Sequence, residues 1–170
     1  MMERQGNQRK KAIWFLAAAV CVLAAVVISG IMLTEGAVET NFAEKNQMPS
    51  LDHLFGTDWM GRDMLARTLA GLSLSIRIGL LTAGISAVLA VVIGTGAALL
   101  GRKADACISW CIDLVMGIPH ILLVMLVSIA CGRGFFGVTA GVALTHWPSL
   151  SRLIRGEVLQ LRGAPYILAA

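Results

Sequence analysis

The sequence of 170 residues is 57% hydrophobic and only 14% charged, and its formal net charge is +4. So little polar surface is incompatible with a soluble globular domain, and we expect a membrane protein. The basic residues stand at the ends of apolar stretches and do not form one contiguous patch, which argues against nucleic-acid binding.

Four apolar stretches are long enough to cross a bilayer. A helix needs about 20 predominantly apolar residues to span the hydrocarbon core. The expected spans are residues 12–33, 74–100, 108–130 and 136–153. With an extracytoplasmic surface helix added, the sequence predicts an all-α, polytopic membrane protein.

The distribution of charge predicts the orientation of these spans. Basic residues favour the cytoplasmic side of a membrane. They precede the first span at Arg9 to Lys11, separate the second and third at Arg102-Lys103, and follow the fourth at Arg152 to Arg162. Residues 1–11 are therefore expected in the cytoplasm and residues 34–73 outside it. The length of the first span favours an uncleaved helix over a cleaved signal peptide, whose apolar region has about 7–15 residues.

The second half of the external segment has features of a helix. Asp58 is a candidate cap, and Asp58 with Arg62 and Asp63 with Arg67 form acid-to-base pairs four residues apart. Three leucines would share one face of such a helix: Leu65, Leu69 and Leu72. We expect an amphipathic helix that lies on the outer membrane face and leads into the second span.

Small residues and helix breakers mark the second and third spans. Ala90, Gly94 and Ala98 recur every four positions, which favours close helix packing, either within this chain or against a partner subunit. Gly117 and Pro119 interrupt the third span, where the proline removes a hydrogen bond and bends the helix. Such a bend is either a simple kink or part of a transport path.

No catalytic or metal-binding pattern stands out. Cys107 and Cys111 lie four apart, and we interpret them as small apolar side chains. His146 is the histidine most worth testing, because a polar ring within a span must face protein or water. It is expected to bond a neighbouring helix, or else to handle a ligand or a proton. The sequence has no HExxH, GxSxG or phosphate-binding loop, so we expect no enzyme and no cofactor, and active transport would need an ATPase on another chain.

One segment before the second span carries a family resemblance. Residues 54–63 read LFGTDWMGRD and resemble the "LGTDxxGRD" signature of permease subunits of the dipeptide, oligopeptide and nickel ABC importers. The similarity continues in the same order through Thr145-His146-Trp147 and residues 166–170, and it covers nearly everything after His53. The matching signature positions are Gly56, Thr57, Asp58, Gly61, Arg62 and Asp63.

The resemblance implies a permease subunit of an ATP-driven importer for peptides or nickel. Residues 74–170 would be a partial permease domain that holds three spans and the start of a cytoplasmic coupling loop. Tyr166, Ala169 and Ala170 would belong to the motif that docks on the ATPase, with Leu168 where the motif has Glu. The chain would then be the front part of a longer permease, truncated at this motif.

The implied setting is the cell membrane. The implied partners are membrane lipid, a second permease subunit, cytoplasmic ATPase subunits and an extracytoplasmic solute-binding protein. Two other classes of function remain open: a structural or assembly membrane protein with no substrate, and an intramembrane enzyme. The polar segment from Gly56 to Asp63 discriminates against both, since neither class requires it.

Overall fold

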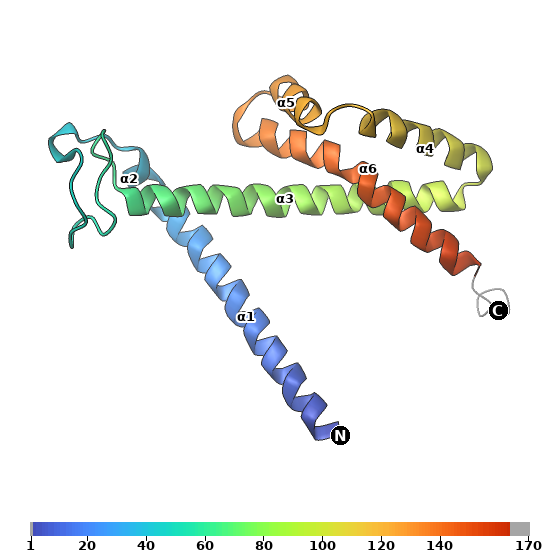
Figure 1. Ribbon diagram of the computed structural model, residues 1–170, viewed down its shortest axis with the longest axis horizontal. Helices are drawn as coiled ribbons and strands as arrows, with labels where there is room; N and C mark the ends of the chain where they lie inside the picture. The colour runs from blue at the N-terminus through green and yellow to red at the C-terminus, as the bar shows by residue number, and fades with distance from the viewer. Residues whose placement is uncertain (1, 164–170) are drawn as a thin grey trace. The chain divides into compact units, whose positions relative to one another are not determined.

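The computed structural model describes residues 2–163, with side chains from Arg9 onward, and consists of helices, short turns and one long loop (Figure 1). Within these residues the β-type pairing is a single bridge between Thr57 and Asp63. The prediction of an all-α fold is therefore confirmed. The helices are α1 (Met2–Met32), α2 (Thr34–Val38), the 3-10 helix η1 (Phe42–Glu44), α3 (Met64–Leu99), α4 (Arg102–Met116), α5 (His120–Ala130) and α6 (Gly134–Arg162).

The chain divides into two compact units, Met1–Arg77 and Ile78–Ala170. In the first unit, the end of α1 packs against the beginning of α3. Ser73 Oγ donates a hydrogen bond of 3.1 Å to the carbonyl oxygen of Val27. A Cβ placed on Gly30 would lie 2.3 Å from the carbonyl oxygen of Leu69, so only glycine permits this approach of the two backbones.

In the second unit, α6 packs against α5, α4 and the second half of α3. The small residues of α3 form its contact with α6. Ala90 and Ala98 are buried, and a Cβ on Gly94 would lie 2.6 Å from the carbonyl oxygen of Ser151. Ser151 Oγ also donates to the carbonyl oxygen of Ala90 at 3.4 Å. The stripe expected from the sequence thus serves packing within the chain.

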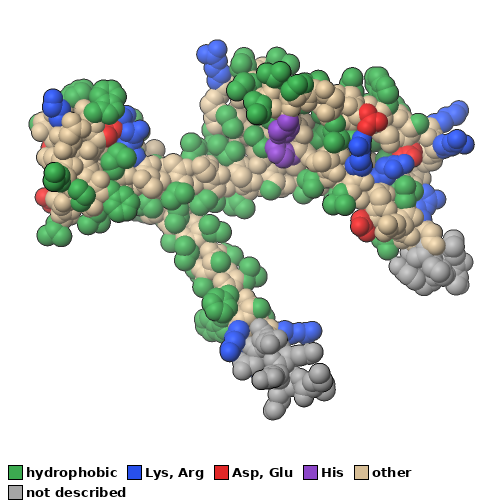
Figure 2. Space-filling model, viewed as in Figure 1, with side chains coloured by type: hydrophobic (Ala, Val, Ile, Leu, Met, Phe, Trp, Pro, Cys, Tyr) green, Lys and Arg blue, Asp and Glu red, His purple; other side chains and the backbone are tan. Residues whose placement is uncertain are grey.

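Two of the described helices are long and apolar enough to cross a membrane, namely α1 from Arg9 to Met32 and α3. A third span is counted if α4 and α5 together form one broken span. Large apolar side chains are exposed along both single helices, as Figure 2 shows; Trp14 is 77% and Leu80 is 70% exposed. Lipid is the environment that such side chains require.

The break in the third expected span is sharper than a kink. Helix α4 ends at Met116, α5 begins at His120, and their axes meet at 94°. Pro119 immediately precedes α5, where its missing N–H costs no helical hydrogen bond. Helix α4 already begins at Arg102, so residues expected in the connecting loop are helical.

The amphipathic helix expected from residue 58 onward begins only at Met64, and it is the first part of α3 and not a separate element. Residues 58–63 are a loop, and α3 then runs from Met64 to Leu99 without a break. The backbone of Gly61 has φ of +75°, which a right-handed helix cannot contain. Asp63 begins the helix, because its Oδ1 accepts a hydrogen bond of 2.9 Å from the backbone N–H of Ala66.

Candidate functional site

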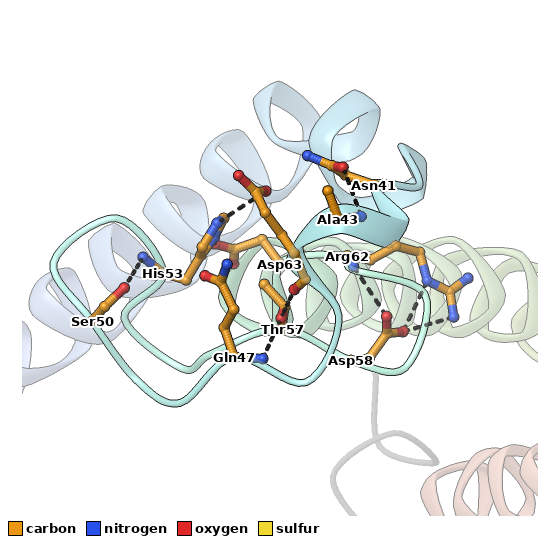
Figure 3. A network of polar contacts seen from close by, with 10 residues as sticks. Asn41, Ala43, Gln47, Ser50, His53, Thr57, Asp58, Arg62 and Asp63 are labelled. Atoms are coloured by element: carbon orange, nitrogen blue, oxygen red, sulfur yellow. Dashed lines mark hydrogen bonds and ion pairs between the residues drawn. The ribbon is translucent and has the colours of Figure 1, made fainter.

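The residues Gly56–Asp63, here called the signature loop, are organised around one carboxylate (Figure 3). Asp58 Oδ1 accepts hydrogen bonds from the backbone N–H groups of Met60 at 2.8 Å and Arg62 at 3.0 Å. Asp58 Oδ2 accepts from the Arg62 side chain, with 2.9 Å to Nε and 2.7 Å to Nη2, and also from Arg67. Charge-assisted bonds of this kind are stronger than neutral ones.

The same contacts keep Asp58 ionised. Partial burial acts against its charge, but the hydrogen bonds from the Arg62 side chain and from the N–H groups of Arg62 and Met60 outweigh it. They hold the pKa of the Asp58 carboxyl far below its usual value. The predicted pair of Asp58 and Arg62 exists, but it joins the two sides of a loop. The predicted pair of Asp63 and Arg67 is wrong, since Arg67 binds Asp58.

Thr57 joins the signature loop to the segment that precedes it. Its side chain accepts a hydrogen bond of 2.9 Å from the Gln47 N–H and donates to the carbonyl oxygen of Glu44. Its own N–H donates to the carbonyl oxygen of Gln47 at 3.1 Å. The residue is 8% exposed, so its polar atoms need these partners. Figure 3 shows Thr57 and Gln47 facing each other across the loop.

Asp63 connects the signature loop with α3 and with His53. Its Oδ2 lies 2.8 Å from His53 Nδ1, while the other ring nitrogen, Nε2, lies 3.5 Å from Glu44 Oε2. His53 was not singled out from the sequence. Its partners are nine and ten residues away along an irregular segment, where no periodicity indicates which side chains will meet.

We expect the signature loop to be most stable in mildly acidic solution. The hydrogen bond to Asp63, and then the nearby Glu44, raise the pKa of His53. A raised pKa means that the folded loop is stabilised when His53 is protonated. This stabilisation is complete at a pH below the pKa of histidine in the unfolded chain, about 6.5, and is lost as the pH rises through the pKa of His53 in the folded loop. The pKa of Asp63 is lowered, because hydrogen bonds from Ala66 and His53 outweigh its partial burial, so its contribution is lost as the pH falls below about 3.9.

The measurement is the rate of tryptic cleavage after Lys45, normalised to an unstructured peptide at each pH. Cleavage should be slower near about pH 6 than near about pH 9. In the variant His53→Gln this difference should shrink. An unchanged pH dependence in that variant would contradict the assignment to His53.

A cavity of about 380 Å³ lies at the break between α4 and α5, facing α6. Two histidines line it: the rings of His120 and His146 are 4.7 Å apart, centre to centre, and nearly perpendicular. His146 Nδ1 lies 2.9 Å from the carbonyl oxygen of Val142 in its own helix. The expected hydrogen bond to a neighbouring helix is thus replaced by a bond within α6 and a ring contact with α5. The remaining lining includes Val115, Met116, Pro119, Thr145, Pro148 and Ser149.

Ion pairs connect α4 with α6. Arg155 binds Asp105 through two nitrogens, with Nη2 to Oδ2 at 2.6 Å, and Arg152 binds Asp113. These ion pairs were not among the predictions made from the sequence. Their spacing in the sequence nevertheless indicates such contacts. The two aspartates stand eight residues apart and so lie near one face of α4, and the two arginines stand three apart and so lie near one face of α6. Near the end of α6, Arg162 donates to the carbonyl oxygen of Ala98.

The other positions considered from the sequence do not form a catalytic or metal-binding group in the described part of the chain. Cys107 and Cys111 are free thiols on α4. In the part of the chain from Arg9 to Gly163, no three His, Cys, Asp or Glu side chains converge on a possible metal position. Tyr166, Ala169 and Ala170, expected in the coupling motif, lie outside the described residues.

Comparison with known proteins gives the chain its family. Residues 86–170 match the model of "Binding-protein-dependent transport system inner membrane component". The dipeptide transport system permease protein DppC of Bacillus subtilis is 33% identical over 144 residues, which are 85% of this chain and 45% of that protein.

The oligopeptide transport system permease protein OppC of the same organism is 34% identical over 131 residues, or 77% of this chain and 43% of that protein. The chain thus spans about half the length of the curated relatives it matches. The matched family model covers α6, α5, α4 and the second half of α3, which form the second packed unit. The chain belongs to the family of inner membrane components of binding-protein-dependent transport systems.

Proposed function

We propose that this chain is a membrane-spanning permease subunit of an ATP-driven peptide importer and forms part of its translocation path. The observation that carries the proposal is the family match over residues 86–170, supported by relatives whose names specify dipeptide and oligopeptide transport. The second unit supplies a packed helical scaffold with a cavity at a broken helix, as a translocation path would need.

The proposed membrane topology has four spans and a cytoplasmic amino terminus. The spans are α1, α3, the broken pair α4 and α5, and the first part of α6. The last of these is supported by residues 134–151, which carry no charged side chain and extend about 27 Å at 1.5 Å per residue. The ion pairs between α4 and α6 support a common membrane side for Arg102-Lys103 and Arg155.

Cysteine labelling tests this topology. In a background with the four native cysteines replaced by serine, Lys45→Cys should react with an impermeant maleimide in intact cells. Lys103→Cys should react only after the membrane is permeabilised, because basic loops favour the cytoplasm. Reaction of both positions from the same side would rule out the proposed topology.

The proposed assembly contains a second permease subunit, cytoplasmic ATPases and an extracytoplasmic solute-binding protein. The family description, a binding-protein-dependent transport system, supports the last of these. No phosphate-binding loop is present in the sequence, so ATP hydrolysis falls to other chains. Docking on the ATPase is assigned to the segment that follows α6, with Tyr166, Ala169 and Ala170 in the contact.

Nickel is a second candidate substrate because of the histidine pair His120 and His146. Imidazole is a good nickel ligand, but two side chains do not complete the coordination that such a cation requires. The peptide is therefore the preferred substrate. A loss of nickel uptake in His146→Ala would indicate that His146 coordinates the metal ion, and does not only pack against its neighbours.

Uptake by the complete transporter tests the proposed function. Cells or proteoliposomes that contain the whole complex should accumulate labelled dipeptide in an ATP-dependent manner. His146→Ala should leave dipeptide uptake within about twofold. Among the described residues, the ring contacts the carbonyl oxygen of Val142 in its own helix and the ring of His120, contacts of about 1 kcal/mol or less. Uptake of a sugar but of neither dipeptide nor nickel would overturn the substrate class. Absence of any uptake by an assembled, ATP-hydrolysing complex would favour a structural role.

A further inference from the structure

A second cavity, of about 300 Å³, lies wholly within the first unit, between the end of α1, α2 and the beginning of α3. Three arginines line it: Arg62 from the signature loop, and Arg67 and Arg77 from α3. The rest of the wall is formed mainly by small or apolar residues, among them Ala37, Val38 and Leu74. The cavity thus combines a cationic side with an apolar side.

The cationic side keeps a net positive charge. A single carboxylate, Asp58, binds both Arg62 and Arg67. Arg77 Nε donates to the carbonyl oxygen of Ser73 at 3.4 Å, which holds the guanidinium beside its own helix. Because Arg62 and Arg67 share this one carboxylate, an excess of positive charge remains even before Arg77 is counted. Each guanidinium also has five N–H donors, more than one carboxylate can accept. The glutamates of this region, Glu35 and Glu39, do not line the cavity.

The position of Arg77 fixes the level of the cavity in the bilayer. Residues 78–99, which directly follow it in α3, contain no charged side chain and are about 33 Å long as a helix. This length matches the hydrocarbon core of about 30 Å. Arg77 therefore stands at one boundary of the core, at the level of the lipid phosphates, where an arginine is stable if its charge reaches the headgroups.

The apolar side of the cavity is open to its surroundings. Val38 is 68% exposed and Leu74 is 41% exposed, although both lie next to the arginines. A small hydrophilic anion would cover neither side chain. An amphiphile satisfies both sides at once, with its anionic group on the guanidinium groups and its acyl chains on the valine and leucine.

We propose that this cavity binds the headgroup of an anionic phospholipid. The phosphate accepts charge-assisted hydrogen bonds from Arg77 and Arg67, a contact for which the guanidinium fork is well suited. A zwitterionic lipid brings the same phosphate together with a cationic amine, which the excess positive charge disfavours. The site would hold the beginning of α3 and the signature loop at the membrane surface. It is independent of which substrate the transporter carries.

Lipid titration of the purified protein, followed by native mass spectrometry, tests the proposal. Phosphatidylglycerol should be retained at lower concentration than phosphatidylcholine. Arg77→Gln should weaken phosphatidylglycerol binding about tenfold, as expected for the loss of charge-assisted hydrogen bonds, and should weaken phosphatidylcholine binding by a smaller factor, so that the preference between the two lipids falls. Arg77→Lys should retain part of the preference. The matched control is Arg133→Gln, in the turn between α5 and α6, which should bind phosphatidylglycerol as the unmodified protein does.

A second variant distinguishes binding in the cavity from general attraction of anionic lipid to the charged surface. Leu74→Trp fills the apolar side without altering any charge and should also reduce phosphatidylglycerol binding, with circular dichroism confirming unchanged helix content. Equal binding of the two lipids, or unchanged phosphatidylglycerol binding in either Arg77→Gln or Leu74→Trp, would overturn the proposal. Displacement of the lipid by inorganic phosphate at similar concentration would assign the site to a free anion instead.

Discussion

Replacing Gly61 with alanine is expected to destabilise the signature loop while leaving the long helices intact. The backbone of Gly61 has φ of +75°, and a Cβ built there would lie 1.7 Å from the carbonyl oxygen of Asn41. The left-handed conformation alone costs a non-glycine residue about 1–2 kcal/mol. Relief of the overlap must move Asn41, whose N–H donates to the carbonyl oxygen of Met60 at 3.1 Å, and this adds about 1 kcal/mol.

The total of about 2–3 kcal/mol should appear as faster tryptic cleavage after Lys45 and Arg62, by roughly 30- to 150-fold if cleavage follows local opening. Gly36→Ala is the matched control, because a Cβ on Gly36 meets no atom within 4 Å and the residue is helical. That variant should be cleaved at the unmodified rate. Equal cleavage of the two variants would show that Gly61 does not limit the stability of the loop.

The helices could be predicted from the sequence because their causes are local. An uncharged run such as residues 78–99 has only one stable form in lipid, and the small residues Ala90, Gly94 and Ala98 already indicated where a neighbour would approach. The partner of that stripe, α6, was not predictable from periodicity. The same stripe would also suit a separate subunit.

The signature loop shows where the sequence reading failed. Acid-to-base spacing of four residues fits a helix, and Asp58 with Arg62 satisfies it, yet the same contact forms in a loop. The decisive difference is the left-handed backbone at Gly61, together with an aspartate that accepts two nearby backbone N–H groups. Glycine permits that conformation without requiring it. Sequence resemblance located the loop, whereas its conformation depends on contacts with residues 41–47.

The contact between His120 and His146 could not be predicted from the sequence either. His120 and His146 belong to different helices, and they meet only because the chain turns by 94° at the break before α5. Gly117 and Pro119 indicated a bend but not its angle. A shallow kink would have sent His120 in another direction.

Reversing the charge of Arg155 is expected to separate α4 from α6 at the end that carries the ion pairs. In Arg155→Asp a bidentate attraction is replaced by repulsion from Asp105, and both side chains are under 30% exposed, so water screens them only in part. The loss of attraction and the new repulsion are each worth about 1 kcal/mol, or about 2 kcal/mol together. For a chain of this size that corresponds to a fall of roughly 4–8 °C in melting temperature.

Tryptophan fluorescence is a suitable readout, because Trp110 lies on α4 and Trp147 on α6. Arg152→Asp is the matched control: its partner Asp113 is 65% exposed, so the same reversal should lower the melting temperature by less than half as much. The double variant Asp105→Arg with Arg155→Asp should recover most of the loss, since it restores an opposite-charge pair in the same place. A double variant no more stable than Arg155→Asp alone would mean that Arg155 acts through packing of its side chain and not through its charge.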